Sequence, residues 1–366
     1  MAEKNSIALA YPPKTWERLG AIMKRGDPGD FDSSVTGDPC IVWDDIHQHY
    51  HMFYFAQKHT QDREVNSNGL AVSENNAGFN RWSKLGPLVY TNPETLGGDT
   101  HKPWILMDPY RANTAARVDG KFWLFTVSIH GKNKIIQAAT SSSLEGPWQV
   151  LPKPVVDIGN PSDFDGYQVD VVTAYWFEKR GEILIYYMGY PLLPQLGQDN
   201  TPYGASSAAA VMRPGEDQAH KLGKVISPST DPNHWTAGYI GGLQIFPALQ
   251  GGWFGLLNAS PTPPAPVERE PSMREPAPSL GGWGYTPEEW PVSGWQIDDQ
   301  PIEWIQDIPI EALKAGEGVN LWRHHLTILP DNSMYLFYNS GSYGNERMFG
   351  RFIASQESPA KVRLFE

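Results

Sequence analysis

Pairs of short apolar runs dominate the hydrophobic pattern of the chain. Five times, a run of small or β-branched residues is followed by a polar or glycine-containing turn and then by an aromatic-rich run. Two such runs joined by a tight turn predict a β-hairpin. The five expected hairpins lie at residues 38–56, 113–128, 170–189, 243–259 and 324–341.

A second sequence pattern, which contains a tryptophan, recurs between the hairpins. It consists of a small-residue strand, a Ser/Asn turn, a tryptophan and a short strand that leads toward proline. The tryptophans are Trp16, Trp82, Trp148, Trp235 and Trp295, and the first three are spaced 66 residues apart. Self-similarity at such a period predicts a repeat architecture.

Each hairpin, together with a third strand and a tryptophan strand, makes a unit of four strands. Five such units predict an all-β fold, a five-bladed β-propeller with four-stranded antiparallel blades. The chain ends on a third strand, residues 346–355, with no tryptophan strand after it. We therefore expect the N-terminal segment around Trp16 to supply the missing outer strand and close the ring, which leaves no exposed sheet edge. Residues 1–366 form one expected domain, with loop insertions near 190–221 and 260–280.

Composition agrees with this fold and narrows the function. The chain has 35 glycines, 32 prolines and 12% aromatic residues, which favours many short strands joined by turns. A formal charge of −12 argues against nucleic acid as a partner, because phosphate binding requires clustered cations. The single cysteine, Cys40, excludes an internal disulfide and a zinc site built from cysteines. We expect no membrane span and no signal peptide, and hence a cytoplasmic protein.

The propeller geometry predicts where chemistry would gather. The first strand of each hairpin would line the central channel, so residues near its start should converge at one end of the axis. Loops between second and third strands return to the same end and bring Glu346 there. The remaining candidates at this end are Asp38, His101, Lys102, Trp104, Asp108, Arg111, Asp170, Arg323, His324 and His325.

Carboxylates with cations and aromatic residues beside them suit glycoside cleavage. One carboxyl group protonates the leaving oxygen, while another activates water or attacks the sugar. Asp38 and Asp170 each stand 22 residues after a tryptophan of the repeat. Structural alternatives exist for some of these candidates: Asp38 precedes a proline and could be a turn former, and Glu346 could form a rim ion pair with Arg347.

Three segments carry a resemblance to a known group. Residues 37–56, the Ser142–Trp148 turn (SSLEGPW) and residues 334–350 resemble the five-bladed β-propeller glycosidases. That group includes arabinanases and β-xylosidases, invertases and levansucrases, anhydro-galactosidases and mannoside phosphorylases. The resemblance implies that Asp38 is the general base or nucleophile and that Asp108, before a proline, steadies the sugar or modulates the acid. The third-blade acid of the group is usually glutamate, whereas this chain has Asp170.

These observations together predict an exo-acting glycoside hydrolase of oligosaccharides, and the resemblance implies that it inverts the anomeric centre. Asp38 would activate water, and Asp170 would donate the proton, with Glu346, His324 or His101 as alternates. The expected sugar-binding residues are His101, Trp104, Arg111, Arg323 and His325. No cofactor and no metal-ligand motif are required, although the surplus of aspartates permits a calcium ion in the central channel.

Two alternatives stay open at this point. The first is a glycoside phosphorylase on the same fold, with phosphate held by cationic side chains such as Arg111, Arg323, His324 and Arg347. The second is a non-catalytic carbohydrate-binding propeller whose carboxylates only hydrogen-bond sugar hydroxyls. The sequence does not specify the sugar, the linkage or the oligomeric state.

Overall fold

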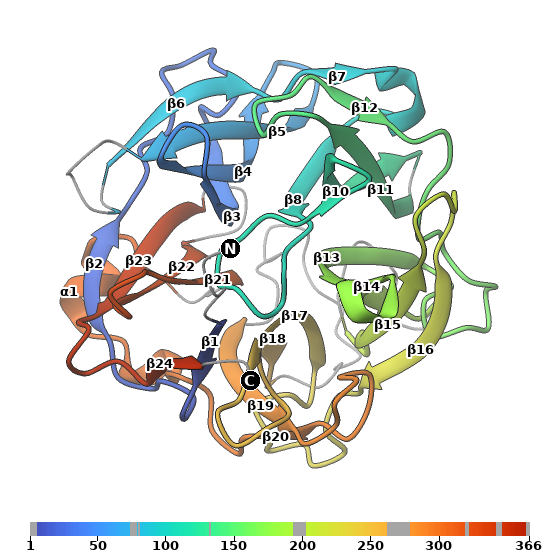
Figure 1. Cartoon of the computed structure of the whole chain (residues 1–366). Coiled ribbons are helices and arrows are strands. Elements are labelled where there is room, and N and C mark those ends of the chain that lie inside the picture. Colours follow the sequence, from blue (N-terminus) through green and yellow to red (C-terminus); the bar gives the residue numbers. More distant parts are fainter. Residues whose placement is uncertain are drawn as a thin grey trace.

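The computed structural model describes residues 6–73, 79, 81–131, 133–192, 203–261, 279–318, 322–341 and 346–363. Five antiparallel sheets stand around a central axis as the blades of a propeller (Figure 1). The all-β, five-bladed prediction is confirmed. Helical structure in the described residues is short and includes η2 (Pro93–Leu96), η3 (Glu178–Arg180), η6 (Ile305–Asp307) and α1 (Ile310–Lys314). None of these helices is long and apolar enough to cross a membrane.

Each blade runs from an inner strand at the axis to an outer strand at the rim (Figure 1). Blade one consists of β3 (Val35–Asp44), β4 (His49–His59), β5 (Glu64–Ser73) and β6 (Trp82–Pro87). Blade two consists of β8 (Thr100–Ile105), β10 (Lys121–His130), β11 (Asn133–Ser141) and β12 (Trp148–Val150), with β7 (Tyr90–Thr91) and β9 (Arg117–Val118) attached. Blade three consists of β13 (Gln168–Phe177), β14 (Glu182–Tyr190), β15 (Ser206–Met212) and β16 (His220–Ile226).

Blade four consists of β17 (Tyr239–Pro247), β18 (Trp253–Ser260), β19 (Leu280–Thr286) and β20 (Gln296–Ile297). Blade five consists of β21 (Trp322–Ile328), β22 (Met334–Ser340), β23 (Arg347–Ile353) and, as its outer strand, the N-terminal β2 (Glu17–Ala21). Next to it, β1 (Ser6–Leu9) pairs with β24 (Ala360–Arg363). The predicted closure of the ring by the N-terminal segment is therefore confirmed.

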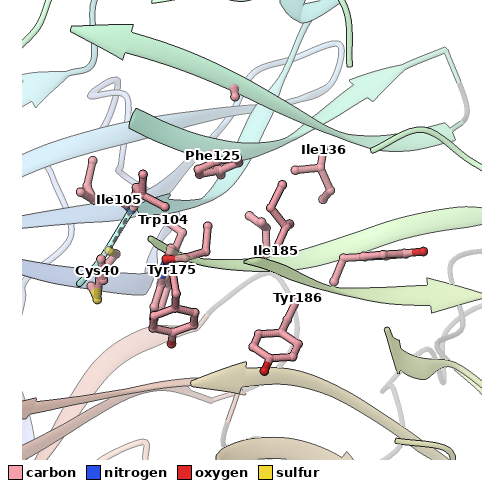
Figure 2. Close-up of a cluster of buried hydrophobic side chains, with 14 of the residues drawn as sticks. Cys40, Trp104, Ile105, Phe125, Ile136, Tyr175, Ile185 and Tyr186 are labelled. Carbon is pink, nitrogen blue, oxygen red and sulfur yellow. Dashed lines mark hydrogen bonds between the residues drawn. The ribbon is translucent and has the colours of Figure 1, made fainter. Parts of the chain in front are cut away.

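The core lies between neighbouring blades. Figure 2 shows aromatic and aliphatic side chains of blades one, two and three packed against one another, among them Phe125, Tyr175 and Tyr186. Cys40 is fully buried there, and its Sγ accepts a hydrogen bond from the Ile105 N–H at 3.3 Å. Burial raises the pKa of the Cys40 thiol to about 12, so this cysteine behaves as a small core residue.

The inner strand of blade two is not the one that the sequence pattern predicts. Residues 113–118 were expected to form it, but the strand beside the axis is β8, which precedes them, and β9 only pairs with two residues of β10. Pro103 within β8 and the polar residues around it obscure the apolar pattern of a buried strand. This shift changes the placement of every candidate between residues 101 and 111.

The loop after β8, residues 106–116, lies at the far end of the axis and contacts every other blade. The N–H of Trp43 in blade one donates to Asn113 O, and Asn113 Nδ2 donates to Ile328 O in blade five at 2.7 Å. The backbone of Met107 forms an isolated parallel β-bridge with Tyr175 in blade three. In blade four, the ring of Trp253 lies 5.3 Å from that of Tyr110. The loop thus closes one end of the channel with backbone and side-chain contacts.

Two further expectations need correction. Trp235 does not lead into an outer strand, because β16 ends at Ile226 and Trp235 lies in the connection to β17, fully buried. The loop predicted near 190–221 is shorter than expected, since β15 and the start of β16 fall within it. The other predicted insertion, 260–280, lies mostly outside the described residues.

Trp235 belongs instead to a turn that precedes the inner strands of three blades. The turn reads GDPGDFD at 26–32, GNPSDFD at 159–165 and STDPNHWT at 229–236. In each copy the first N–H donates to the last carbonyl, at 3.2, 3.1 and 3.3 Å respectively. The turn therefore delivers the chain to the start of β3, β13 and β17 in the same way.

Candidate active site

Every inner strand carries a β-bulge at the same level of the ring. At each bulge one residue has a positive φ: Asp38 (46°), Lys102 (55°), Val171 (48°), Gly242 (60°) and Arg323 (50°). Four of the five are not glycine, and a β-branched valine in this region is a backbone outlier. Bulges re-aim side chains, and strain of this kind concentrates at functional sites. The fold therefore brings five equivalent bulges together at one end of the axis.

Asp38 is held rigidly at this end. Its side chain is 3% exposed, its N–H donates to Asn339 Oδ1 at 2.5 Å, and its Oδ1 accepts from Asn339 Nδ2 at 2.6 Å. The preceding residue, Gly37, has to be glycine, because a Cβ there would lie 2.6 Å from the Asn339 amide. Burial raises the pKa of Asp38, and the cations Lys102 and Arg323 oppose that rise.

Asp170, in blade three, is surrounded by cations. Lys102 Nζ lies 2.6 Å from Oδ1, and Lys134 Nζ lies 2.8 Å from Oδ2. The Tyr190 hydroxyl donates to Oδ2 at 3.3 Å, and the Val171 N–H donates to Oδ1 at 2.7 Å. Burial alone would raise the pKa of Asp170, but the two lysines hold it well below its usual value. The two lysines therefore favour the ionised form of Asp170.

His101 and Arg323 complete the cluster and each present one open polar atom. In the part of the chain that the structure describes, His101 Nε2 and Arg323 Nη2 have no hydrogen-bond partner. Arg323 Nη1 donates to Val172 O at 3.2 Å, which fixes the guanidinium. Burial, Lys134 and Lys102 lower the pKa of His101 well below its usual value, so the ring is neutral. Both groups are suited to hydrogen-bond a ligand.

The side chains at this end of the axis carry more positive than negative charges, although the whole chain is negatively charged. Three cations, Lys102, Lys134 and Arg323, act on the two carboxylates Asp38 and Asp170. Local cationic excess in a protein of formal charge −12 indicates a site that binds polar or anionic groups. We call these five residues and His101 the axial cluster.

The neighbouring histidines and Trp104 make packing and hydrogen-bond contacts within the fold. Trp104 is 1% exposed, and its Nε1 donates to Ala174 O at 3.3 Å. His325 is fully buried, and its Nε2 accepts from the Ile41 N–H at 3.3 Å. The expectation that these two residues bind sugar directly stays a prediction. Burial lowers the pKa of His324 to about 3, which makes it a poor proton donor near neutral pH.

Asp108 and Arg111 lie away from the axial cluster. They form an ion pair with each other, Arg111 Nε to Asp108 Oδ2 at 2.8 Å, in the loop that closes the far end of the channel. Their expected position at the mouth is wrong, because the inner strand β8 precedes them and carries the chain to the opposite end. A role for either in direct sugar contact at the axial cluster is inconsistent with this placement.

Glu346 is buried immediately before β23, where it interacts electrostatically with Arg25. The charges that act most strongly on Asp38 are Lys102, Arg323 and Asp170, and Glu346 is not among them. The next residue, Arg347, donates to Ala315 O and lines a cavity of about 470 Å³ together with Lys24 and Arg25. The structure therefore groups Glu346 with the cations of blade five and the N-terminal segment.

Sequence reasoning missed three residues of the site: Lys134, Asn339 and Tyr190. Each is a polar or amphipathic residue at the end of a second or third strand that faces the axial cluster. Lys134 lies at the start of β11, Asn339 near the end of β22, and Tyr190 at the end of β14. A polar residue that interrupts an apolar strand at this end is the signal that could have found them.

Solved structures with the same fold are numerous. A protein solved as a complex with RGII superposes with a TM-score of 0.68 at 12% identity, with 93% of this protein and 92% of the other covered. A structure from the GH130 family of mannoside phosphorylases, which contains glycoside hydrolases that target β-1,2 mannosidic linkages in Candida mannan, gives 0.64 at 14% identity, with 99% of each protein covered. The endo-arabinase of Bacteroides thetaiotaomicron gives 0.53 at 12% identity, with 92% and 97% covered.

No protein-family model matches the chain, and no curated protein sequence matches it either. The chain is therefore similar to these proteins in its fold, a five-bladed propeller. The similarity extends over nearly the full length of each chain. The resemblance found in the sequence motifs is confirmed at the level of architecture.

Proposed function

We propose that the chain is a glycosidase that cleaves the glycosidic bond of an oligosaccharide at the axial cluster. The observation that carries this proposal is Asp38, a buried residue whose carboxyl group has a raised pKa and whose backbone N–H and Oδ1 are both hydrogen-bonded to Asn339. A raised pKa suits a carboxyl group for proton transfer near neutral pH. Propellers with glycoside-cleaving names and the same full-length architecture support the assignment.

In this mechanism Asp38 removes a proton from water as the water oxygen attacks the anomeric carbon. The glycosidic C–O bond breaks in the same step, and the leaving oxygen takes its proton from solvent water. His101 Nε2 and Arg323 Nη2 hydrogen-bond sugar hydroxyls and orient the ring. Asp170 acts as an ion and not as the expected proton donor, because Lys102 and Lys134 keep it deprotonated. Its negative charge stabilises the oxocarbenium-like transition state and orders the two lysines. Direct attack by water inverts the anomeric centre, and we expect release of single sugars from a chain end.

The deciding experiment is turnover by Asp38→Asn on a panel of oligosaccharides that includes mannan- and pectin-derived chains. We expect activity to fall by about 10²–10⁴-fold or more, the range for loss of a proton-transfer group. Asp62→Asn, which changes an exposed aspartate, is the matched control and keeps full activity. An Asp38→Asn enzyme that turns over at the wild-type rate would rule out the assignment. Binding of a sugar by wild type without any product would point to a carbohydrate-binding propeller instead.

The cationic excess of the axial cluster supports one second candidate, phosphorolysis. Phosphate as the nucleophile needs no base, so Asp38, whose pKa is raised by burial, would protonate the leaving oxygen. Lys102, Lys134 and Arg323 would hold the phosphate, whereas the expected partners Arg111 and Arg347 lie elsewhere. Sugar phosphate formed only when inorganic phosphate is added would establish this reaction, and turnover independent of phosphate would establish hydrolysis.

A further inference from the structure

Three histidines and two carboxylates gather at the far end of blade one, where β3 turns into β4. Asp44 ends β3, His47 lies in the turn, and His49 and His51 open β4. Glu145, from the turn before β12 in blade two, reaches the same place. Asp38 lies toward the opposite end of β3, so this group of five residues is separate from the axial cluster.

Asp44, His49 and His51 have the spacing of metal ligands. One donor atom from each of these residues lies within 4.8 Å of the other two. The imidazole rings of His49 and His51 have centroids 4.7 Å apart, and His51 Nδ1 lies 3.6 Å from Asp44 Oδ2. His47 Nδ1 is hydrogen-bonded to the same Asp44 Oδ2 at 2.8 Å. Ligand atoms around a zinc ion sit about 2.0–2.2 Å from it, so a small rotamer adjustment would bring the three into coordination.

His51 has an unmet requirement that a metal ion would satisfy. Its side chain is fully buried, and within the described residues neither of its ring nitrogens has a hydrogen-bond partner. The contacts to Asp44 and Glu145, both 3.6 Å, are too long for hydrogen bonds. His49 Nε2 is likewise buried without a partner in this part of the chain. Buried polar nitrogens are almost always satisfied, and leaving them unsatisfied is costly.

We propose that Asp44, His49 and His51 bind a divalent transition-metal ion of the zinc class. Two imidazoles and one carboxylate suit zinc and its neighbours, whereas calcium and magnesium prefer all-oxygen sites. His47 fixes the Asp44 carboxylate by its hydrogen bond, as outer-sphere partners of metal ligands do. Glu145 adds a second negative charge beside the ion and links it to blade two. The ion therefore ties the end of β3 to the start of β4 within blade one and has a structural role.

The test is titration of the chelator-treated full chain with Zn²⁺ alone, followed by competition with a chromophoric chelator. We expect wild type to bind one equivalent and His49→Gln to bind it at least tenfold more weakly. His220→Gln is the matched control, because it changes an exposed histidine on β16, and its affinity equals that of wild type. An absence of stoichiometric binding, or equal affinity of wild type and His49→Gln, would overturn the proposal.

Two further measurements keep the result independent of folding defects. Zn²⁺ should raise the Tm of wild type and of His220→Gln, and should leave that of Asp44→Asn unchanged, because only binding to the folded state stabilises it. Co²⁺ in place of Zn²⁺ should give visible absorption bands with wild type that His49→Gln lacks, with both proteins folded by circular dichroism. A Tm rise of equal size in all variants, or identical Co²⁺ spectra, would contradict the site.

Discussion

Asp38 and Asp170 are two buried aspartates of one cluster, yet their pKa values move in opposite directions. Burial destabilises the charged form of both. Asp170 makes direct contact with two ammonium groups at 2.6 and 2.8 Å, which outweighs its burial. Asp38 accepts a hydrogen bond from a neutral amide, so burial has the larger effect on its pKa. The environment thus separates a carboxyl group that can transfer protons from one that serves as a fixed charge.

The pH dependence of activity should respond to Asn339. The hydrogen bond from Asn339 lowers the pKa of Asp38, so Asn339→Ala raises that pKa further. Asp38 acts as a base when ionised, and activity is lost as the pH falls through its pKa. The acidic limb of the kcat/KM profile therefore shifts to higher pH in this variant. A limb that stays in place or moves to lower pH would show that Asp38 is not the titrating base.

The stability of the protein should depend on Asp170 most strongly at neutral pH. Asp170→Asn removes the carboxylate that contacts two partly buried lysines, and loss of one partner of a buried ion pair costs about 3–5 kcal/mol. The folded pKa is depressed, so this contribution is complete above the unfolded pKa of about 3.9 and is lost as the pH falls below it. Urea unfolding at pH 7 and at lower pH gives the free energy of unfolding of variant and wild type. The difference between the two values should become smaller as the pH falls. Asp157→Asn, at an exposed position, should match wild type throughout.

At the scale of elements, the repeated turn before the inner strands positions the axial cluster. Asp32 in blade one accepts from the Tyr54 hydroxyl at 3.0 Å and pairs with Lys84 at 2.6 Å. Its counterpart Asp165 in blade three makes the same contacts with the second and fourth strands of its own blade, Tyr187 at 3.0 Å and Lys221 at 2.7 Å. Asp165 is therefore a buried anchor as well as a turn residue. Each anchor lies six residues before the bulge of its inner strand.

Gly159 makes this anchoring possible and should not tolerate a side chain. A Cβ at Gly159 would lie 2.3 Å from Asp165 Oδ1, and the equivalent Gly26 shows the same distance to Asp32 Oδ1. We expect Gly159→Ala to lower the free energy of unfolding by about 1–3 kcal/mol, the usual cost of overpacking. Ser162→Ala, an exposed change in the same turn, should have an effect within about 0.5 kcal/mol. Equal stability of both variants in urea would refute the anchoring role.

At the scale of the whole molecule, the ring is closed by strands from both ends of the chain and by a charged network. Arg18 of β2 and Arg351 of β23 both pair with Glu303 and Glu317, from the segment between blades four and five. The Tyr338 hydroxyl donates to Glu317 at 2.6 Å. The network therefore joins the N-terminal strand to the last blade through groups that are largely removed from water.

Removal of Arg351 should weaken closure. Its side chain is 5% exposed, and its loss leaves the buried Glu317 with one cation fewer. We expect Arg351→Leu to cost about 3–5 kcal/mol and to lower the Tm. Lys153→Met, which breaks an exposed pair with Asp217, should change stability by less than about 1 kcal/mol. Thermal unfolding of the two variants side by side measures the difference, and equal Tm values would contradict a closing role for the network.

The sequence by itself determined the number of blades, the closure by the N-terminal segment and the position of Asp38. These follow from local signals, since strands and turns are encoded by short apolar runs, and a fixed period reveals the repeat. The pattern failed at β8, where Pro103 and polar neighbours hide a buried strand, so Asp108 and Arg111 were placed at the wrong end. It also predicted an outer-strand position for Trp235, because a tryptophan that follows small residues has the same local sequence pattern in a turn as in a strand.

Only the tertiary structure decided which side chains meet and which are charged. Asp170 is joined by Lys134, 36 residues before it, and Asp38 by Asn339, 301 residues after it. Contacts over such separations depend on how the blades pack, which no local pattern records. The ionisation of each aspartate depends in turn on those contacts and on burial. The sequence therefore identified the aspartates, while the folded ring determined their chemistry.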